Sequence, residues 1–215
     1  MNRWTDSLFI LVVIIDFFLL AASRLRAMIR AAAAQGALLS LLALVLAWGE
    51  AQVGHTIALA AGALVVKGAL IPWLLYWAIH EASIRREVEP IVGFVPSLVL
   101  GALGVGAAFA LSSYLPLPTG AVHAYLVPTA LSTVWTGLLL IVTRRKAVTQ
   151  VIGFLVLENG VFVFGLLLSD FMPAMVEAGV LLDLFAAVFV MGIVMFDINR
   201  EFSSMDTEKL SSLKD

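Results

Sequence analysis

The sequence predicts an all-α, polytopic membrane protein with seven transmembrane helices. The first observation is composition: of the 215 residues 62% are hydrophobic and 13% are charged, and the mean hydropathy is +1.05. Soluble domains carry about 25% charged residues. The second observation is a series of apolar runs close to the roughly 20 residues that an α-helix needs to cross a bilayer. Because the bilayer core offers no water to the backbone, each run has to satisfy its own hydrogen bonds as a helix.

Seven apolar runs meet this criterion. The first run is as hydrophobic as a signal peptide, but it contains Asp16 and has no basic segment before it and no clear cleavage site. We therefore expect it to be a retained span. A polar tail, residues 199–215, follows the last run. The expected spans are approximately residues 7–23, 31–48, 54–79, 91–114, 123–143, 148–168 and 174–196.

The distribution of positive charges predicts the orientation of the helices, because Lys and Arg in short loops accumulate on the cytoplasmic side. With the N-terminus outside and the C-terminus in the cytoplasm, eleven cations fall on the inside, only Arg3 falls outside, and Lys67 lies within a span. Adding or removing one helix would break this alternation, so the asymmetry also supports the helix count. The inside cations are Arg24, Arg26, Arg30, Arg85, Arg86, Arg144, Arg145, Lys146, Arg200, Lys209 and Lys214.

Prolines are expected to kink three of the helices. A proline inside a helix removes the hydrogen bond to the carbonyl four residues before it. Pro72, Pro96 and Pro128 are each predicted to interrupt a span in this way. Glycines are dense in the fourth and sixth spans, where small residues permit close helix packing.

An uncharged, turn-rich loop over residues 115–120 divides the chain. We expect a four-helix N-terminal part over residues 1–115, a three-helix part over residues 116–198, and a cytoplasmic tail over residues 199–215.

The residues that are missing exclude several classes of function. There is no cysteine, so the chain cannot hold an iron–sulfur cluster through thiolates or form a disulfide. The three histidines are scattered, and we find no cluster of metal ligands in the sequence. The net charge of −2 and the lack of a basic run exclude the usual nucleic-acid binders. We therefore expect no catalytic site, no cofactor and no metal, and any redox centre should sit on another subunit.

Ionisable side chains within the predicted spans are the strongest functional signal. A charged side chain at the bilayer centre costs about 2.5–3.5 kcal/mol on insertion scales, so it requires a partner, water or a function. Three central acids and one central lysine predict a hydrated polar axis. The central residues are Asp16, Lys67, Glu158 and Asp183, while Glu177 and His123 lie nearer the outer ends of their spans.

A polar axis of this kind is typical of proton transfer. Desolvation brings buried carboxylates and amines toward the neutral range, so each can exchange a proton with a chain of water molecules. Glu158 is the strongest candidate, because Asn159 and Gly160 beside it give an otherwise apolar helix a place for water or a bulge.

Structural interpretations stay open for the other residues. Asp16 can pair across a helix interface, and Lys67 can bind the carbonyl that the proline at position 72 frees. Glu177 and His123 can be interfacial residues, and Asp183 can also have a packing role.

Two stretches resemble a known family. The segment from Arg144 contains GFLVLENGVFVFG, ending at Gly165, and a second stretch reads KGALIP from Lys67. Both are similar to the hydrogenase-4 component E family, and the similarity covers essentially the whole chain. The last three helices are similar to the K subunit of respiratory complex I and to the C subunit of multisubunit cation/proton antiporters.

The resemblance implies roles for individual residues. Glu158 matches the intramembrane glutamate in the second helix of the complex I subunit, a proton-path residue. Asp183 would match the acidic residue of the third helix, although the complex I subunit has glutamate there and Glu177 competes for the role. Lys67 lies in an N-terminal extension that the complex I subunit lacks, so no role carries over to it.

The residues and the resemblance together predict a noncatalytic inner-membrane subunit of a group 4 nickel–iron hydrogenase, or of a related complex I-like oxidoreductase, that contributes to proton translocation. Expected partners are antiporter-like and quinone-module-like membrane subunits, a hydrogenase-type peripheral arm reached through them, and lipid. Two alternatives stay open: a small subunit of a multisubunit cation/proton antiporter, and a purely structural membrane anchor. The predicted proton-path residues are Glu158, Asp183, Lys67, Glu177 and Asp16.

Overall fold

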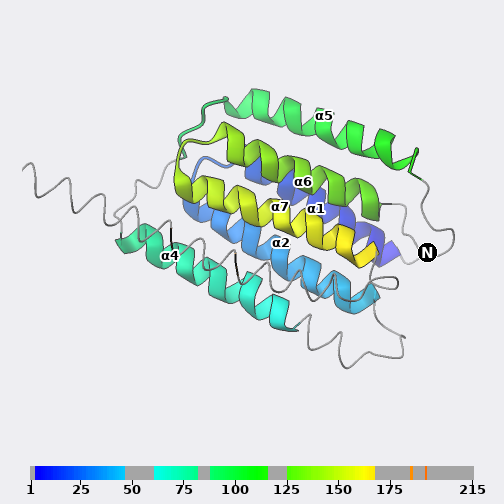
Figure 1. The fold of residues 1–215 in the computed structure, drawn as a ribbon, viewed down its shortest axis with the longest axis horizontal. Coiled ribbons are helices and arrows are strands. Elements are labelled where there is room, and N and C mark those ends of the chain that lie inside the picture. Colours follow the sequence, from blue (N-terminus) through cyan, green and yellow to red (C-terminus); the bar gives the residue numbers. More distant parts are fainter. Residues whose placement is uncertain are drawn as a thin grey trace, which may run out of the picture.

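The computed structural model describes residues 3–46, 61–81, 88–115 and 125–167, together with residues 185 and 192. Within these residues the protein is all-α, with an isolated β-bridge between Pro90 and Arg144. The helices run side by side as a bundle (Figure 1). They are α1 (Arg3–Ala21), α2 (Leu25–Leu46), a π-helical turn η1 (Val66–Leu70) that continues into α4 (Ile71–Glu81), α5 (Phe94–Ser112), α6 (Leu126–Thr143) and α7 (Ala147–Leu167).

Some of the helices are long enough to cross a membrane. In the described part of the chain, four are both long and apolar enough: Leu25–Val45, Phe94–Ser112, Leu126–Thr143 and Ala147–Leu166. At 1.5 Å per residue, the 22 residues of α2 extend about 33 Å, close to the thickness of the hydrocarbon core. The seventh expected span, residues 174–196, lies outside the described residues apart from Phe185 and Gly192.

The second helix begins earlier than hydropathy suggested. The expected span was residues 31–48, whereas α2 begins at Leu25 and therefore includes Arg26 and Arg30. Long basic side chains at a helix end extend their charged heads toward the interface, so a helix can continue past the last apolar residue.

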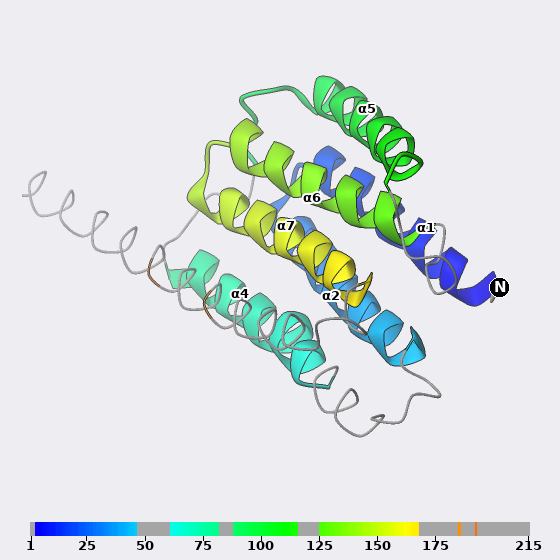
Figure 2. The same ribbon diagram turned by 45° about the vertical axis from the view of Figure 1, so that its right-hand side comes forward.

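The hairpin of α6 and α7 forms the centre of the described bundle. Helices α1 and α5 pack against α6, while α2 packs against α7 and carries η1 and α4 on its other side (Figures 1 and 2). Outward-facing apolar side chains on the outer helices match a lipid environment, since a soluble monomer rarely exposes so continuous an apolar surface. Examples are Ile10, Ile14, Val95, Val99 and Leu103.

Glycines bring α6 and α7 into backbone contact. A Cβ added at Gly137 would lie 2.4 Å from the backbone nitrogen of Leu157, and one at Gly160 would lie 2.6 Å from that of Val134. Gly153 meets the backbone of Ile141 in the same way, at 2.9 Å. These approaches confirm the packing role expected for Gly153 and Gly160 of the sixth span, whereas nothing lies within 4 Å of a Cβ added at Gly165.

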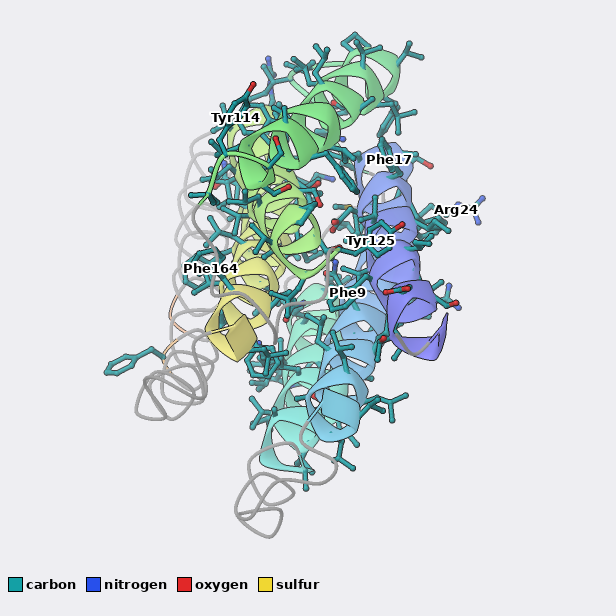
Figure 3. The ribbon with its side chains drawn as sticks, turned by 90° about the vertical axis from the view of Figure 1, so that its right-hand side faces the viewer. Phe9, Phe17, Arg24, Tyr114, Tyr125 and Phe164 are labelled. Carbon is teal, nitrogen blue, oxygen red and sulfur yellow. The ribbon has the colours of Figure 1, made fainter. Side chains whose placement is uncertain are left out.

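A glycine also positions α5 on α6. The indole of Trp135 occupies the space beside Gly104, where a Cβ would lie 2.0 Å from the ring, and its Nε1 donates a hydrogen bond of 3.0 Å to the carbonyl of Leu100. On the α1 side, Phe17 points toward α5 and contacts the surface at Gly101 (Figure 3).

Three connections meet at one end of the bundle, which we call the basic end: residues 22–24, 88–93 and 144–146. Backbone hydrogen bonds join them from Val88 to Ser23 at 2.9 Å and from Arg145 to Glu89 at 3.1 Å. An ion pair of 3.2 Å between Lys146 and Glu89 adds to the second contact. The ends of α1, α6 and α7 and the approach to α5 are therefore fixed to one another.

The guanidinium of Arg144 is fully buried at this end. It donates a hydrogen bond of 2.7 Å to the carbonyl of Leu20, in the last turn of α1, and one of 3.1 Å to the carbonyl of Val92, just before α5. It also lies over the ring of Phe94, 5.2 Å from the centroid. Burial lowers the pKa of Arg144 from its ordinary value. A cation at the carbonyl end of α1 is favourable, because the last carbonyls of a helix have no partner within it.

The expectation that prolines interrupt three helices is wrong for two of them. Pro96 and Pro128 are the third residues of α5 and α6. The backbone N–H groups in the first turn of a helix have no partner within the helix, so a proline there breaks no bond. Of the three prolines, only Pro72 follows a helix distortion. The backbone N–H of Ile71, the residue before it, donates a hydrogen bond to the carbonyl of Val66, five residues back. This bond makes the π-helical turn η1.

We predict that Gly137→Ala lowers the free energy of unfolding by about 1–3 kcal/mol, because the added methyl group would overlap the α7 backbone. Gly106→Ala on α5 is the control. Nothing lies within 4 Å of its added Cβ, so it should change stability by less than about 1 kcal/mol, through helix propensity alone. Unfolding in mixed micelles titrated with sodium dodecyl sulfate measures both, and equal effects would contradict this packing.

We predict that Arg144→Lys destabilises the protein by about 1–3 kcal/mol even though the charge is kept. A single ammonium cannot donate to the Leu20 and Val92 carbonyls in the forked geometry of a guanidinium. Arg145→Lys, at the exposed neighbouring position, should have no measurable effect in the same unfolding assay. An Arg144→Lys protein as stable as the parent would show that the two carbonyl contacts contribute nothing.

Candidate functional site

A continuous chain of hydrogen-bonded polar side chains crosses the buried middle of the bundle. Lys67 Nζ donates to Asn159 Oδ1 at 3.1 Å, and Asn159 Nδ2 donates to Gln35 Oε1 at 3.2 Å. Gln35 Nε2 then donates to Asp16 Oδ1 at 2.8 Å. Thr133 Oγ1 donates to the other oxygen, Asp16 Oδ2, also at 2.8 Å. We call these five residues the polar chain; they come from η1, α7, α2, α1 and α6.

Local backbone geometry brings the lysine to the polar chain. Lys67 lies in the π-helical turn η1, and a Cβ added at Gly36 would be only 2.8 Å from the Lys67 Cβ. The glycine therefore lets η1 approach α2 directly beside Gln35. The Lys67 ammonium also lies 4.9 Å from the ring centroid of Phe162, a distance typical of a cation–π contact.

The charges at the two ends of the polar chain compensate each other. The ammonium of Lys67 can only donate hydrogen bonds, and the ionised carboxylate of Asp16 can only accept them. Every donor between them points toward Asp16, so the arrangement suits a charged lysine at one end and an accepting carboxyl oxygen at the other, connected through two amides. All five residues are buried, so the hydrogen bonds replace the hydration that the charges lose.

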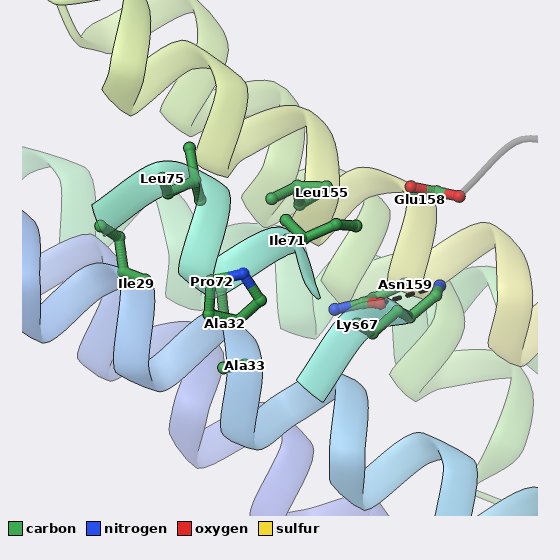
Figure 4. Close-up of a pocket in the computed structure, with 10 residues that line it drawn as sticks. All are labelled: Ile29, Ala32, Ala33, Lys67, Ile71, Pro72, Leu75, Leu155, Glu158 and Asn159. Carbon is green, nitrogen blue, oxygen red and sulfur yellow. Dashed lines mark hydrogen bonds between the residues drawn. The ribbon is translucent and has the colours of Figure 1, made fainter. Parts of the chain in front are cut away.

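Glu158 lies beside the polar chain at a small cavity. The cavity has a volume of about 20 Å³ and lies between α2, η1, α4 and α7. Glu158, Asn159 and Lys67 provide its polar groups, and the rest of the lining is apolar (Figure 4). A cavity of this size holds about one water molecule. The carboxylate of Glu158 is 2% exposed, so it belongs to the interior of the bundle and not to its lipid surface.

The structure brings together three of the five predicted proton-path residues. Asp16 and Lys67 end the same polar chain, and Glu158 shares a cavity with Lys67. Asp183 and Glu177 lie outside the described residues, as does His123.

The structure shows contacts for two of the residues with structural alternatives. Asp16 does pair across helix interfaces, with Gln35 and Thr133. Lys67 donates to the side chain of Asn159.

Sequence reasoning missed Gln35 and Thr133, and it treated Asn159 only as a neighbour of Glu158. The signal was present, since each of these uncharged polar residues lies near the middle of its own helix, among apolar residues. A buried charge needs partners, and such residues are where they are found. Within the described residues, no group of three or more possible metal ligands occurs.

A set of apolar helices held together by buried, hydrogen-bonded charges defines a multi-pass membrane protein with ionisable groups inside the membrane. Comparison with known proteins is more specific. Residues 124–215 match the family of the NADH-ubiquinone/plastoquinone oxidoreductase chain 4L. Over 156 residues the chain is 31% identical to hydrogenase-4 component E of Escherichia coli, which covers 72% of this chain and 71% of that protein. The protein therefore belongs to the hydrogenase-4 component E family.

Other comparisons extend the similarity along the chain. An uncharacterized protein of Mycobacterium tuberculosis is 34% identical over 192 residues, covering 89% of this chain and 87% of that protein. Hydrogenase-4 component E of Shigella flexneri matches over the same 72% of this chain. No solved structure matches. The family resemblance predicted from the GFLVLENGVFVFG stretch is thus confirmed.

We predict that Asp16→Leu lowers the free energy of unfolding by about 1–3 kcal/mol more than Asp16→Asn does. An asparagine keeps an acceptor for Gln35, and its amide can donate to the Thr133 hydroxyl, whereas leucine leaves both buried groups without a partner. Asp6→Leu, in the first turn of the same helix, should cost less than about 1 kcal/mol. If the two Asp16 variants proved equally stable, the hydrogen bonds to Asp16 would not stabilise the bundle.

Proposed function

We propose that this protein is a noncatalytic membrane subunit of a group 4 hydrogenase, or of a related complex I-like oxidoreductase, and that its intramembrane carboxylates contribute to proton translocation. The observation that carries the proposal is the buried polar chain together with Glu158 at the adjoining cavity. In this view the redox chemistry occurs on other subunits, and this chain supplies ionisable groups inside the membrane.

The free-energy cost of placing charged residues inside the membrane supports a role beyond packing. Leucine or alanine would fill these positions without the insertion penalty of a charge, which is about 2.5–3.5 kcal/mol for a central acid or lysine. Asp16, Lys67 and Glu158 are nonetheless gathered in one region of the bundle. A carboxylate beside a space for one water molecule is suited to exchanging a proton with that water. The proposal extends the path to Asp183 and Glu177.

The chain-4L match gives the proposal a second support. The matched region, residues 124–215, contains Thr133, Glu158 and Asn159, whereas Asp16, Gln35 and Lys67 lie before it. The polar chain therefore joins a part of the protein that is shared with a complex I subunit to a part that is not. We propose that the division near residue 116 separates these two parts and that both contribute to the path.

The proposed topology has seven spans in the inner membrane, with the N-terminus outside and the C-terminus in the cytoplasm. The basic end supports this topology. Arg24 lies in the connection 22–24, and Arg144 and Lys146 lie in the connection 144–146. Both connections are hydrogen-bonded to the segment 88–93, so these cations lie at the same end of the bundle. Positive charge collected at one end marks the cytoplasmic side. Figure 3 shows Arg24 pointing away from the bundle, as expected of a residue at that surface.

The decisive variant is Glu158→Gln in the assembled complex. Removing the carboxylate while keeping the shape should lower the number of protons moved per turnover by about tenfold or more, since the group would no longer accept a proton. Proton movement is measured in membrane vesicles with a pH-sensitive dye while turnover is followed in the same sample. Glu89→Gln, at an exposed ion pair of the basic end, is the control and should leave the ratio unchanged.

Normal assembly with unchanged proton movement in Glu158→Gln would contradict the proposal and favour a structural anchor. Copurification distinguishes a hydrogenase-type complex from a cation/proton antiporter. A nickel-containing subunit among the copurified proteins supports the hydrogenase-type complex. Antiporter subunits with no nickel-containing subunit support the antiporter.

A further inference from the structure

The cavity beside Glu158 extends from its polar groups toward the basic end of the bundle. Glu158 and Asn159 lie near the middle of α7, and Leu155, which also lines the cavity, comes before them on this helix, which begins at the basic end. Helix α2 begins at the same end, and its lining residues all lie in its first half: Ile29, Ala32 and Ala33. In Figure 4, Ile29 and the polar residues lie at opposite ends of the lining.

Helix α4 gives the same direction. It runs from η1 toward the basic end, because the Tyr76 hydroxyl donates a hydrogen bond of 3.4 Å to the carbonyl of Arg26, in the first turn of α2. Pro72 and Leu75 line the cavity and lie between Lys67 and Tyr76 along the chain. On three elements, therefore, the apolar lining lies on the basic-end side of the polar groups.

A short apolar layer closes the cavity toward the basic end. Ile29 and Leu75 form it, and each is 1% exposed. At 1.5 Å per residue, Ile29 lies about 6 Å from the start of α2 and about 6 Å from Ala33. Polar groups follow directly beyond the layer, at the hydrogen bond between Tyr76 and Arg26. Apolar constrictions of this kind act as gates, because they exclude water until their side chains move.

The opposite side of the polar groups is packed with apolar side chains. Phe162, one turn beyond Glu158 on α7, places its ring centroid 4.9 Å from the Lys67 ammonium. This ring packs against a hydrophobic cluster that includes Leu39 on α2 and Val163 on α7, both fully buried. Within the described residues, this cluster lies between the cavity and the end of the bundle that faces away from the basic end.

Water suits the cavity by size and by chemistry. The volume of about 20 Å³ holds about one water molecule, and a lipid chain or an aromatic ring is larger. The Lys67 ammonium donates hydrogen bonds, a Glu158 carboxylate accepts them, and the Asn159 amide does both. A water molecule at this place therefore has donors and acceptors to bond.

We propose that water reaches Glu158 and Lys67 from the basic end, between α2 and α4, and not from the opposite end, and that Ile29 and Leu75 gate this access route. The inference rests on the proposed function for its role, since it names the side from which the proton path at Glu158 exchanges protons. Under the proposed topology that side is the cytoplasm. The access route itself is a property of these helices, so it is tested without measuring proton movement.

The test uses single cysteines, because the chain has none of its own. Ala33→Cys places a thiol on the cavity lining, and Ala32→Cys is a second reporter. The probe is the silver ion, which is close to water in size and, being charged, crosses a bilayer only slowly. The full-length protein in its complex is exposed to silver in membrane vesicles of either orientation. Thiols of this chain that have not reacted are then labelled with a maleimide after denaturation.

Ser23→Cys provides the reference for the side. Ser23 is exposed at the basic end, so an impermeant maleimide labels this cysteine in the vesicles whose basic end faces outward. The result therefore does not depend on which compartment the basic end faces in the cell.

We expect silver added on the basic-end side to react with Ala33→Cys at least about tenfold faster than silver added on the opposite side. Two neighbouring alanines are the controls. Ala34→Cys follows directly on α2 but is exposed at the surface of the bundle, and it should react slowly from both sides because a thiol in lipid does not ionise. Ala37→Cys lies one turn beyond Ala33, past the contact with Lys67, and should react slowly from the basic-end side.

Ile29→Ala tests the gate. A shorter side chain opens the apolar layer, so the reaction of Ala33→Cys from the basic-end side should become about threefold faster or more, with no change from the opposite side. If this variant fails to fold, Leu75→Val opens the layer less and has the same expected direction.

Three results overturn the access route: Ala33→Cys and Ala32→Cys protected from silver on the basic-end side, equal rates from both sides, or rates no faster than that of Ala34→Cys. An unchanged rate in folded Ile29→Ala and Leu75→Val variants overturns the gate.

Failure of this labelling is distinguishable from failure of the proposed function. Silver reports on water access within the chain, whereas the Glu158→Gln experiment reports on protons moved by the complex. Access without proton movement would leave the route and remove its role. Proton movement without access from the basic end would leave the proton path and overturn the route.

Discussion

Charges that lie in the apolar middle of the bundle have to satisfy one another, because neither lipid nor bulk water is available to solvate them there. The described structure meets this constraint with direct contacts: Asp16 and Lys67 are separated by two amides, and each polar atom along the way has a partner of the opposite kind. Five structural elements must hold their relative positions for these contacts to exist. The polar chain therefore depends on the packing of these elements and also stabilises it.

Small residues make that packing possible. The backbone contacts at Gly137 and Gly160 fix the rotation of α7 against α6, and that rotation directs Asn159 toward α2 and Glu158 toward the cavity. Gly36 admits η1 beside Gln35, and the π-helical turn ending at Leu70 sets the position of Lys67. At the basic end, Arg144 fixes α1 to the start of α5 through two carbonyls. Precise placement of a few ionisable groups therefore depends on contacts spread along the whole bundle.

The two parts of the chain are joined through their polar residues. Thr133, Glu158 and Asn159 belong to the region shared with chain 4L, while Asp16, Gln35 and Lys67 belong to the segment before it. An extension that only filled space would need apolar contacts alone. This one contributes both charged residues of the polar chain, Asp16 and Lys67.

The sequence by itself determined the helical membrane fold, the family, and most of the described helix positions, because the free energy of moving a segment into a bilayer is nearly a sum over its residues. It also singled out Asp16, Lys67 and Glu158, since a charge in an apolar run is conspicuous wherever it lies. It could not assign partners. Which face of α2 carries Gln35 toward Asp16, and whether Pro72 or Pro96 distorts a helix, depend on helix rotation and on where each helix begins. Those are set by contacts between segments far apart in the chain, and only the tertiary structure decided them.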